Sequence, residues 1–426
     1  MITDIEKDGI TALMKREIIP AIGCTEPTAV ALCTAKATEV LGCRPDKITA
    51  YLSANVIKNA MGVGIPGTGM IGLPIAIALG ALVGKSEYQL EVLRDLKPDD
   101  VADGRKMIDE KRIEVKLKSD IEDKLYIEIH CEAGEDKSIA VIRGNHTFFS
   151  LIEKNGRVIE ENEYCASEGG DSDIKLSFAK LYEYAMTTPL DELEFIMEAA
   201  EMNRKASEES RKSNFGHNIS KNVRSHRGKL LFGENHHSSM LAMTSGACDV
   251  RMDGAMVPVM SNTGSGNQGI AATLPVLTYA EEINASHEQL VRALILSNLS
   301  MIYIKQYLGR LSALCGCVIA STGASCGLTY LMGGSYEQTT YAAKNMVATL
   351  TGMVCDGAKP SCALKLSIGV STASLAALLA MNNEVTSSQE GIIDDSIDKT
   401  IENLARVANE GMPQTDKVVL DIMVNK

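Results

Sequence analysis

The amino-acid sequence predicts an α+β protein, in which a mainly helical domain is interrupted by a smaller inserted domain that contains a sheet. The 426 residues are enough for two domains. Residues 85–190 are rich in charge and alternate with a period of two, whereas the chain before and after them has long apolar segments with helical spacing. We therefore expect a discontinuous helical domain, residues 1–84 plus 191–426, and an inserted α+β domain, residues 85–190.

The helical elements follow from apolar spacing and from helix-breaking residues. Residues 1–19 have helical spacing and end at Pro20, which cannot continue a helix. A second helix is expected over residues 28–41, and residues 48–56 alternate like a strand. After the inserted domain, helices are expected at 191–210, 270–284, 287–308, 313–332, 337–353, 362–381 and 396–409.

The inserted domain carries the clearest strand patterns. Residues 112–118 (RIEVKLK) and 125–131 (LYIEIHC) alternate between apolar and polar side chains, as half-buried strands do. Residues 138–143 and 146–153 continue the pattern, with glycine and asparagine at the intervening turns. These segments predict the sheet of the inserted domain.

Composition narrows the classes of partner and compartment. The formal net charge is -13 and no dense Lys/Arg cluster stands out, so we expect no nucleic-acid partner. The first twenty residues mix acids and bases without the apolar stretch of a signal peptide, so we expect a cytoplasmic protein. There the eleven cysteines would stay reduced, as core residues, metal ligands or reactive thiols.

Two uncharged segments, residues 59–84 and 311–336, are long enough to cross a bilayer. The first is rich in glycine and proline, and the second is built mostly of small residues, so neither has the bulky apolar content that favours insertion. We expect buried helices and glycine-rich loops here, and no membrane partner. The sequence leaves the oligomeric state open, and a homo-oligomer is compatible with it.

The first candidate site is Gly23-Cys24-Thr25-Glu26-Pro27, a cysteine and a carboxylate where a loop enters a helix. The free amides and the dipole of a helix N-terminus lower a thiol pKa and so favour the thiolate, which binds metal or attacks a substrate. The alternative is a structural capping loop, with Thr25 as the N-cap residue and Pro27 near the first helical position.

The second candidate site is segment 261–269, SNTGSGNQG, which runs into an apolar helix. Such a loop offers backbone amides to an anion. A dinucleotide is not expected, because another helix follows where a βαβ unit would need a strand. We expect a bound carboxylate instead, and a simple tight turn is the alternative. The expected binding residues are Asn262, Gly264, Ser265, Gly266 and Asn267.

The third candidate site is a group of cysteines, Cys315, Cys317, Cys326, Cys355 and Cys362. Their spacing gives neither the CxxC pairs of a zinc ribbon nor the CxxCxxC of a ferredoxin. By spacing alone they are ordinary buried cysteines or a site of another kind.

The histidines are less informative. His236 and His237 lie in a polar segment, where they would act as a base or ligand or would simply be solvated.

Four long segments run in order through nearly the whole chain: GCTEPTAVAL at 23–32, SNTGSGNQGI at 261–270, ALCGCVIASTGASCGLTYLMGG at 313–334 and TGMVCDGAKPSCALKLS at 351–367. Together they resemble the L-cysteine desulfidase family and, more distantly, the α-chain of iron-sulfur L-serine dehydratases. The chain lacks the histidine that the dehydratases carry where GCTEP stands, and it lacks the terminal cysteine of some of them. Both differences favour the desulfidase.

The resemblance implies a 4Fe-4S cluster that three cysteines hold, so that one iron stays open to the substrate as a Lewis acid. The matching positions are Cys24, Cys317 in preference to Cys315, and Cys355. The dehydratases have a further ligand at the position of Cys362, which joins the expected set.

The reaction implied by the resemblance is a β-elimination without pyridoxal phosphate, from L-cysteine to sulfide, pyruvate and ammonia. A base removes the α-proton while the thiol leaves. Glu26 and Lys359 stand beside expected ligands and are the candidate bases, with a structural ion pair as the alternative for each. L-Serine dehydratase is the alternative enzyme, and an amino-acid sensor with a cluster but no turnover is the alternative outside catalysis. The helical domain is the expected catalytic domain.

Overall fold

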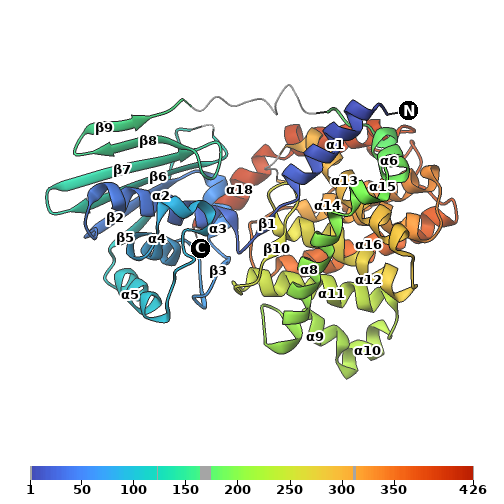
Figure 1. Cartoon of the computed structure of the whole chain (residues 1–426), viewed down its shortest axis with the longest axis horizontal. Helices are drawn as coiled ribbons and strands as arrows, with labels where there is room; N and C mark the ends of the chain where they lie inside the picture. The colour runs from blue at the N-terminus through green and yellow to red at the C-terminus, as the bar shows by residue number, and fades with distance from the viewer. Residues whose placement is uncertain (1, 122, 164–173, 310–312, 426) are drawn as a thin grey trace.

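The segments with a period of two form a six-stranded sheet, and the long apolar segments form a helical body beside it (Figure 1). The computed structural model describes residues 2–121, 123–163, 174–309 and 313–425. Each of the two lobes has a hydrophobic core of its own. The protein is therefore α+β and mainly helical, as the sequence predicts.

The sheet lobe is built on a mixed sheet with strand order β5-β2-β6-β7-β8-β9, in which only β2 and β5 run parallel. The strands are β2 (Lys47–Leu52), β5 (Ile113–Leu117), β6 (Tyr126–Ala133), β7 (Asp136–Arg143), β8 (Phe149–Lys154) and β9 (Arg157–Glu161). The lobe also holds α2 (Thr25–Leu41), α3 (Ala54–Ala60), α4 (Leu73–Leu82), a 3-10 helix (Ser86–Glu91), α5 (Pro98–Asp109) and the pair β3 (Gly64–Ile65) and β4 (Met70–Ile71). Helix α2 packs on β6, β7 and β8.

The sheet lobe begins earlier in the chain than the expected start of the inserted domain at residue 85. Apolar residues between 29 and 82 pack in the core of the sheet lobe with those between 125 and 142. Strand β2 is hydrogen-bonded between β5 and β6. The backbone N–H and C=O groups of a buried strand need hydrogen-bond partners. The partners of β2 are in β5 and β6, so β2 belongs to the sheet lobe. The low charge of this segment reflects its burial and does not report which lobe it joins.

The helical lobe has helices α1 (Asp4–Glu17), α6 (Phe178–Thr187), α7 (Leu190–Leu193), α8 (Ile196–Lys212), α9 (Ile219–Arg224), α10 (His226–Phe232), α11 (His236–Met252), α12 (Gly266–Glu282), α13 (His287–Leu308), α14 (Gly316–Leu331), α15 (Tyr336–Leu350), α16 (Cys362–Met381) and α17 (Ile397–Arg406). Strands β1 (Pro20–Ala21) and β10 (Val259–Met260) form an antiparallel pair, and β10 packs against α12. Helix α13 packs closely against α14, and α16 packs against α11, α14 and α15.

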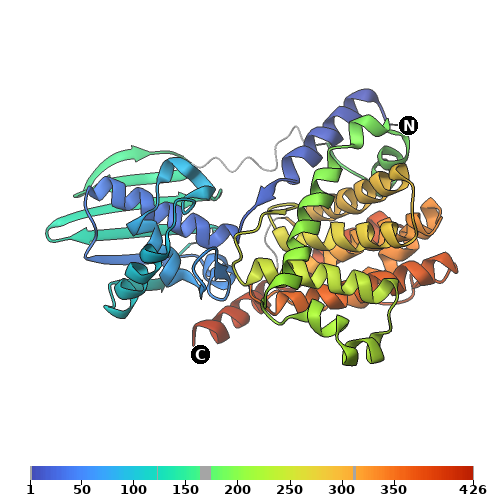
Figure 2. The same cartoon turned by 60° about the horizontal axis from the view of Figure 1, so that its bottom comes forward.

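The C-terminal helix α18 (Pro413–Val424) follows a π-helical turn (Val407–Gly411) and leaves the helical lobe (Figures 1 and 2). It packs against α3, and Leu420 joins the core of the sheet lobe. The C-terminal helix therefore connects the helical lobe to the sheet lobe.

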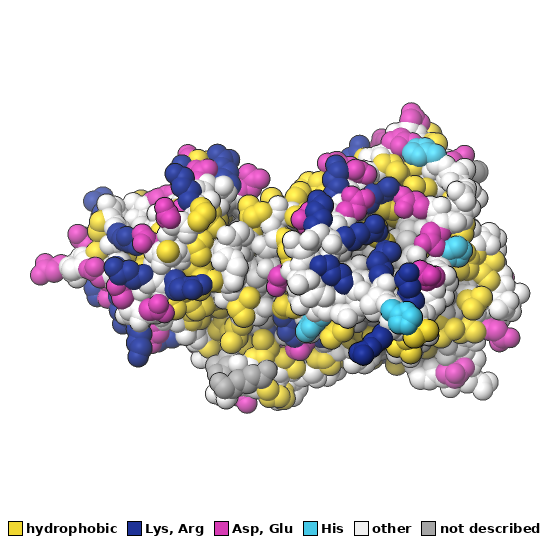
Figure 3. Space-filling view, turned by 90° about the horizontal axis from the view of Figure 1, so that it is seen from below, with side chains coloured by type: hydrophobic (Ala, Val, Ile, Leu, Met, Phe, Trp, Pro, Cys, Tyr) yellow, Lys and Arg dark blue, Asp and Glu magenta, His cyan; other side chains and the backbone are white. Residues whose placement is uncertain are grey.

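Charges of both signs share the surface. On one face of the molecule, Lys and Arg side chains are interspersed with Asp and Glu (Figure 3). Ion pairs between neighbouring side chains include Arg204 with Glu281 and Lys212 with Glu209. Among the described helices, α16 alone is long and apolar enough to cross a membrane.

Candidate active site

A cavity of about 140 Å³ lies where the two lobes meet. Its walls come from α2 and α3 of the sheet lobe and from α11 to α14 and α16 of the helical lobe. All four sequence segments with candidate residues therefore meet at one place. The lining residues are Cys24, Thr25, Glu26, Asn55, Lys58, Asn59, Arg251, Thr263, Gly264, Ser265, Asn267, Gln268, Lys305, Leu314, Cys315, Gly316, Cys317, Cys355, Gly357, Ala358, Cys362, Lys365 and Leu366.

Four helices, α2, α12, α14 and α16, begin at this cavity. Their N-cap residues are Cys24, Ser265, Cys315 and Ser361, and none of these side chains caps its helix. The first amides of each helix therefore lack a capping side chain, and they carry the positive end of the helix dipole. The cavity thus offers helix N-termini to a bound anion such as a carboxylate. The alternative expectation of Thr25 as an N-cap is wrong, because α2 begins at Thr25 itself.

Two basic side chains of the cavity wall are held by ion pairs. Lys58 is only 3% exposed, and its Nζ lies 2.6 Å from Asp416 Oδ1 on α18. Lys365 pairs with Asp356, and its Nζ also donates to the Val354 carbonyl at 2.7 Å. The cavity wall therefore contains cations that the surrounding structure holds in place.

Arg251 joins two of the candidate segments. Its Nη1 donates to Asn267 Oδ1 at 3.0 Å, and its Nη2 donates to the Gly23 carbonyl at 2.8 Å. The side chain is 4% exposed and has no carboxylate partner within the described residues. A buried charge without a counter-charge is costly, so an anion in this cavity would stabilise Arg251.

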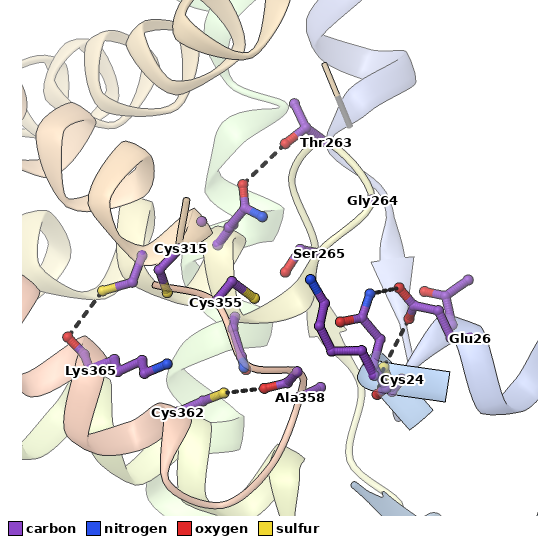
Figure 4. Close-up of a pocket in the computed structure, with 18 of the residues that line it drawn as sticks. Cys24, Glu26, Thr263, Gly264, Ser265, Cys315, Cys355, Ala358, Cys362 and Lys365 are labelled. Atoms are coloured by element: carbon purple, nitrogen blue, oxygen red, sulfur yellow. Dashed lines mark hydrogen bonds between the residues drawn. The ribbon is translucent and has the colours of Figure 1, made fainter. Parts of the chain in front are cut away.

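Cys315 and Cys355 both line the cavity. The residues before them, Leu314 and Val354, form an isolated antiparallel β-bridge. Residues next to a bridged pair point to the opposite face from that pair. Cys315 and Cys355 therefore share a face and lie near each other (Figure 4). Burial, helped by the neighbouring sulfurs, raises the pKa of the Cys315 thiol.

Cys362 opens α16 on the same side of the cavity (Figure 4). Burial raises its thiol pKa, and the nearby Cys355 sulfur contributes to this effect. Cys317, by contrast, is packed between α14 and α16, since its Sγ donates to the Lys365 carbonyl at 3.1 Å. A Cβ placed on Gly369 would lie 2.7 Å from that sulfur. Cys317 is thus more strongly engaged in packing than Cys315.

Cys24 lies across the cavity, at the N-terminus of α2 (Figure 4). Its Sγ donates to Glu26 Oε2 at 3.0 Å, and Asn59 Nδ2 donates to Glu26 Oε1 at 3.0 Å. Burial and the Glu26 carboxylate raise the pKa of the Cys24 thiol. The lowering expected at a helix N-terminus is therefore wrong, because loss of hydration outweighs the dipole.

The 261–269 loop turns sharply before α12. Asn262 and Ser265 pair across the turn, and Thr263 and Gly264 have φ angles of 48° and 80°. Two positive φ angles define a type I′ turn, which explains the glycine. Ser265 and Asn267 line the cavity as expected, and so does Gly264.

Two of the residues expected to bind substrate lie outside the cavity wall. Asn262 is fully buried, and its Nδ2 donates to Asn298 Oδ1 at 3.0 Å. Gly266 lies against the Arg251 guanidinium, since an added Cβ would come within 2.3 Å of Nε. Both residues therefore pack the loop against the helical lobe and do not line the cavity.

Other candidates also lie away from the cavity. Lys359 Nζ is bound to the carboxylate and the carbonyl of Asp356, both at 2.6 Å, and is not among the lining residues. Cys326 is fully buried in the helical core. His236 pairs with Glu282, while His237 lies beside α16.

Sequence reasoning missed Lys58, Asn59, Arg251 and Lys305, all of which line the cavity. These residues belong to no recognisable motif. Lys58 is the only charged residue of α3, and a lone charge in an otherwise uncharged helix is a signal that could have found it.

The donor set suits an iron-sulfur cluster in its chemistry. Cysteine thiolates are the usual ligands of such clusters, and the cysteines lining the cavity are free. Within the described residues, no three His, Cys, Asp or Glu side chains are close enough to hold one metal ion. A cluster of several irons is larger than one ion, so its ligand sulfurs stand further apart.

Comparison with known proteins places the chain in a family. Residues 87–421 match the family model of the serine dehydratase alpha chain. A UPF0597 protein of Bacteroides fragilis is 58% identical over 425 residues, covering 100% of this chain and 99% of the relative. UPF0597 proteins of Phocaeicola vulgatus (59% over 428 residues, covering 100% of this chain and 99% of the relative) and Photobacterium profundum (42% over 423 residues, 98% and 99%) are also similar. The chain therefore belongs to the serine dehydratase alpha chain family, within its UPF0597 group.

Proposed function

We propose that this protein is an L-cysteine desulfidase, a lyase that depends on a 4Fe-4S cluster and converts L-cysteine and water to sulfide, pyruvate and ammonia. Membership of the serine dehydratase alpha chain family supports lyase chemistry. The observation that carries the proposal is the convergence of free cysteines and four uncapped helix N-termini on one cavity. Such a site suits both a thiolate-bound cluster and the carboxylate of an amino acid.

Cys315, Cys355 and Cys362 are the proposed ligands of the cluster. They lie on one side of the cavity, whereas Cys24 lies across it beside Glu26 (Figure 4). This choice departs from the expected ligands at two positions: it leaves out Cys24, which lies across the cavity (Figure 4), and it takes Cys315 in place of Cys317, whose sulfur packs between two helices. When bound, the cluster would supply a Lewis acid for the leaving sulfur.

The substrate carboxylate is proposed to bind at the start of α12. The Ser265 and Asn267 side chains and the first amides of that helix face the cavity. Arg251, held by Asn267 and Gly23, supplies the positive charge behind them. A carboxylate here would compensate the buried guanidinium.

Glu26 is the proposed base for the α-proton. It is the one carboxylate among the residues described in the cavity wall, and Asn59 fixes its Oε1. Its Oε2 accepts from the Cys24 thiol, so a proton can be shared between these two groups. Lys359 is less suitable, because Asp356 holds its ammonium outside the cavity wall.

The test is anaerobic turnover by the reconstituted protein with L-cysteine and L-serine, followed by sulfide and pyruvate. L-Serine dehydratase is the second candidate, which the description of the matched family favours. We expect the larger kcat/KM with L-cysteine. Preference for L-serine would support the dehydratase, and a reconstituted protein that converts neither amino acid would contradict both.

A further inference from the structure

Helix α16 exposes an apolar stripe along one face. The spacing of its members is close to whole helical turns, so they line up on one side. Their exposed fractions lie between 37% and 55%, whereas the opposite side of the helix is buried in the lobe. The stripe consists of Leu364, Ile368, Leu375, Leu378 and Leu379.

No charge interrupts this stripe. Lys365 is the only charged residue of α16, and its ammonium is held by the Val354 carbonyl and Asp356. A face that a monomer turns to water normally carries charged side chains. A continuous exposed apolar face is instead typical of an interaction site.

The stripe is long enough for the central part of a protein interface. From Leu364 to Leu379 it runs about 22 Å along the helix. A standard interface of about 800 Å² per partner is roughly 30 Å across.

The stripe is also largely self-complementary. Four of its five bulky residues are placed symmetrically about positions 371–372, which are a serine and a threonine. Ile368 and Leu375 lie equally far from this centre, and so do Leu364 and Leu379. If two copies of α16 cross antiparallel on a two-fold axis, these four residues meet their counterparts, Leu378 falls opposite Lys365, and the small residues lie at the crossing.

We propose that α16 forms the two-fold interface of a homodimer, with Ile368 of one copy against Leu375 of the other. The proposal does not depend on the proposed enzymatic function, because it uses only the exposed face of α16. The length and apolar composition of α16 would also suit a membrane. The symmetric placement favours a second copy, since a bilayer requires no symmetry along the helix.

The test is the mass of the full-length protein in solution, measured by light scattering and by sedimentation at several concentrations. We expect twice the chain mass of 45.8 kDa. Ile368→Glu should raise the dissociation constant more than about 100-fold, because the two-fold axis buries two unpaired charges. Val158→Glu, at a 48% exposed position on β9, is the matched control and should stay dimeric.

A charge-pair variant tests the register. Leu375→Lys alone should also give monomers, while Ile368→Glu combined with Leu375→Lys should restore the dimer, because each Glu then faces a Lys of the other copy. Circular dichroism shows whether each variant is folded. A monomeric wild type, a dimer unaffected by Ile368→Glu, or failure of the double variant to reassociate would overturn the proposal. Flotation of a monomeric wild type with phosphatidylcholine vesicles would also overturn it.

Discussion

Replacing Ser265 separates a substrate-binding loop from a merely structural turn. Ser265 Oγ faces the cavity and makes no side-chain hydrogen bond within the described residues. Ser265→Ala should therefore change the free energy of unfolding by less than about 0.5 kcal/mol. A hydrogen bond to a charged carboxylate contributes about 1.5–3 kcal/mol, so KM should rise roughly ten- to a hundredfold.

Asn267→Ala should behave differently, because Asn267 Oδ1 also accepts from Arg251. Loss of this partner leaves a buried guanidinium with one hydrogen bond, so the free energy of unfolding should fall by about 1–3 kcal/mol. The assays are urea unfolding and steady-state kinetics, with iron content measured on the same samples. An unchanged KM in both variants, at unchanged iron content, would refute the substrate role of the loop.

Three further changes test the structure around the site and in the sheet lobe. Asp416→Asn leaves the buried Lys58 without its counter-charge, and urea unfolding should show a loss of about 2 kcal/mol; no loss would mean that α18 does not hold α3. Hydrogen bonds from His130, whose effect is the largest, and from Tyr126 and Lys118 together lower the pKa of Glu128 from 4.5 to about 2. This carboxylate therefore contributes about 2–3 kcal/mol at neutral pH, lost as pH falls from about 4.5 to 2, and urea unfolding of Glu128→Gln should lack that component. Gly357→Ala should lower the free energy of unfolding by at least about 2 kcal/mol, because φ is +91° and the new Cβ would lie 1.9 Å from the Lys58 carbonyl; a wild-type urea midpoint would contradict the close packing of this loop on α3.

Much of the helical lobe follows from the sequence alone. The limits expected at 287–308 and 362–381 coincide with α13 and α16. Helix α13 starts at a Ser286–Gln289 capping box, and Gly309 follows its last residue, so local signals mark both ends. Helix α16 begins at Cys362, two residues after Pro360, which restricts the chain before it.

The lobe to which residues 25–84 belong was not predictable from local pattern. Hydrophobic spacing reports which side chains are buried and says nothing about the partner that buries them. Strand β2 has its partners more than 60 residues further along, in β5 and β6. Only the tertiary pairing therefore assigns α2, β2 and α4 to the sheet lobe.

The candidate site was predictable in part. Cys24, Glu26, Ser265, Asn267 and Cys355 came from motifs, and the structure brings them to one cavity. The choice between Cys315 and Cys317 depends on the Leu314–Val354 contact and on helix packing, which spacing does not reveal. Arg251 was missed because no motif includes it, although its burial and its two hydrogen bonds mark it plainly in three dimensions.

The iron and sulfide content of cysteine variants after anaerobic reconstitution tests the central claim most directly. The visible absorbance of the cluster can be followed on the same samples. We predict about four irons and four sulfides per chain in the wild type. Serine at Cys315, Cys355 or Cys362 should abolish cluster binding, whereas Cys24→Ser and the control at the exposed Cys43 should retain it. A wild type that takes up no iron and sulfide, or a cluster that survives all three ligand substitutions, would contradict the account.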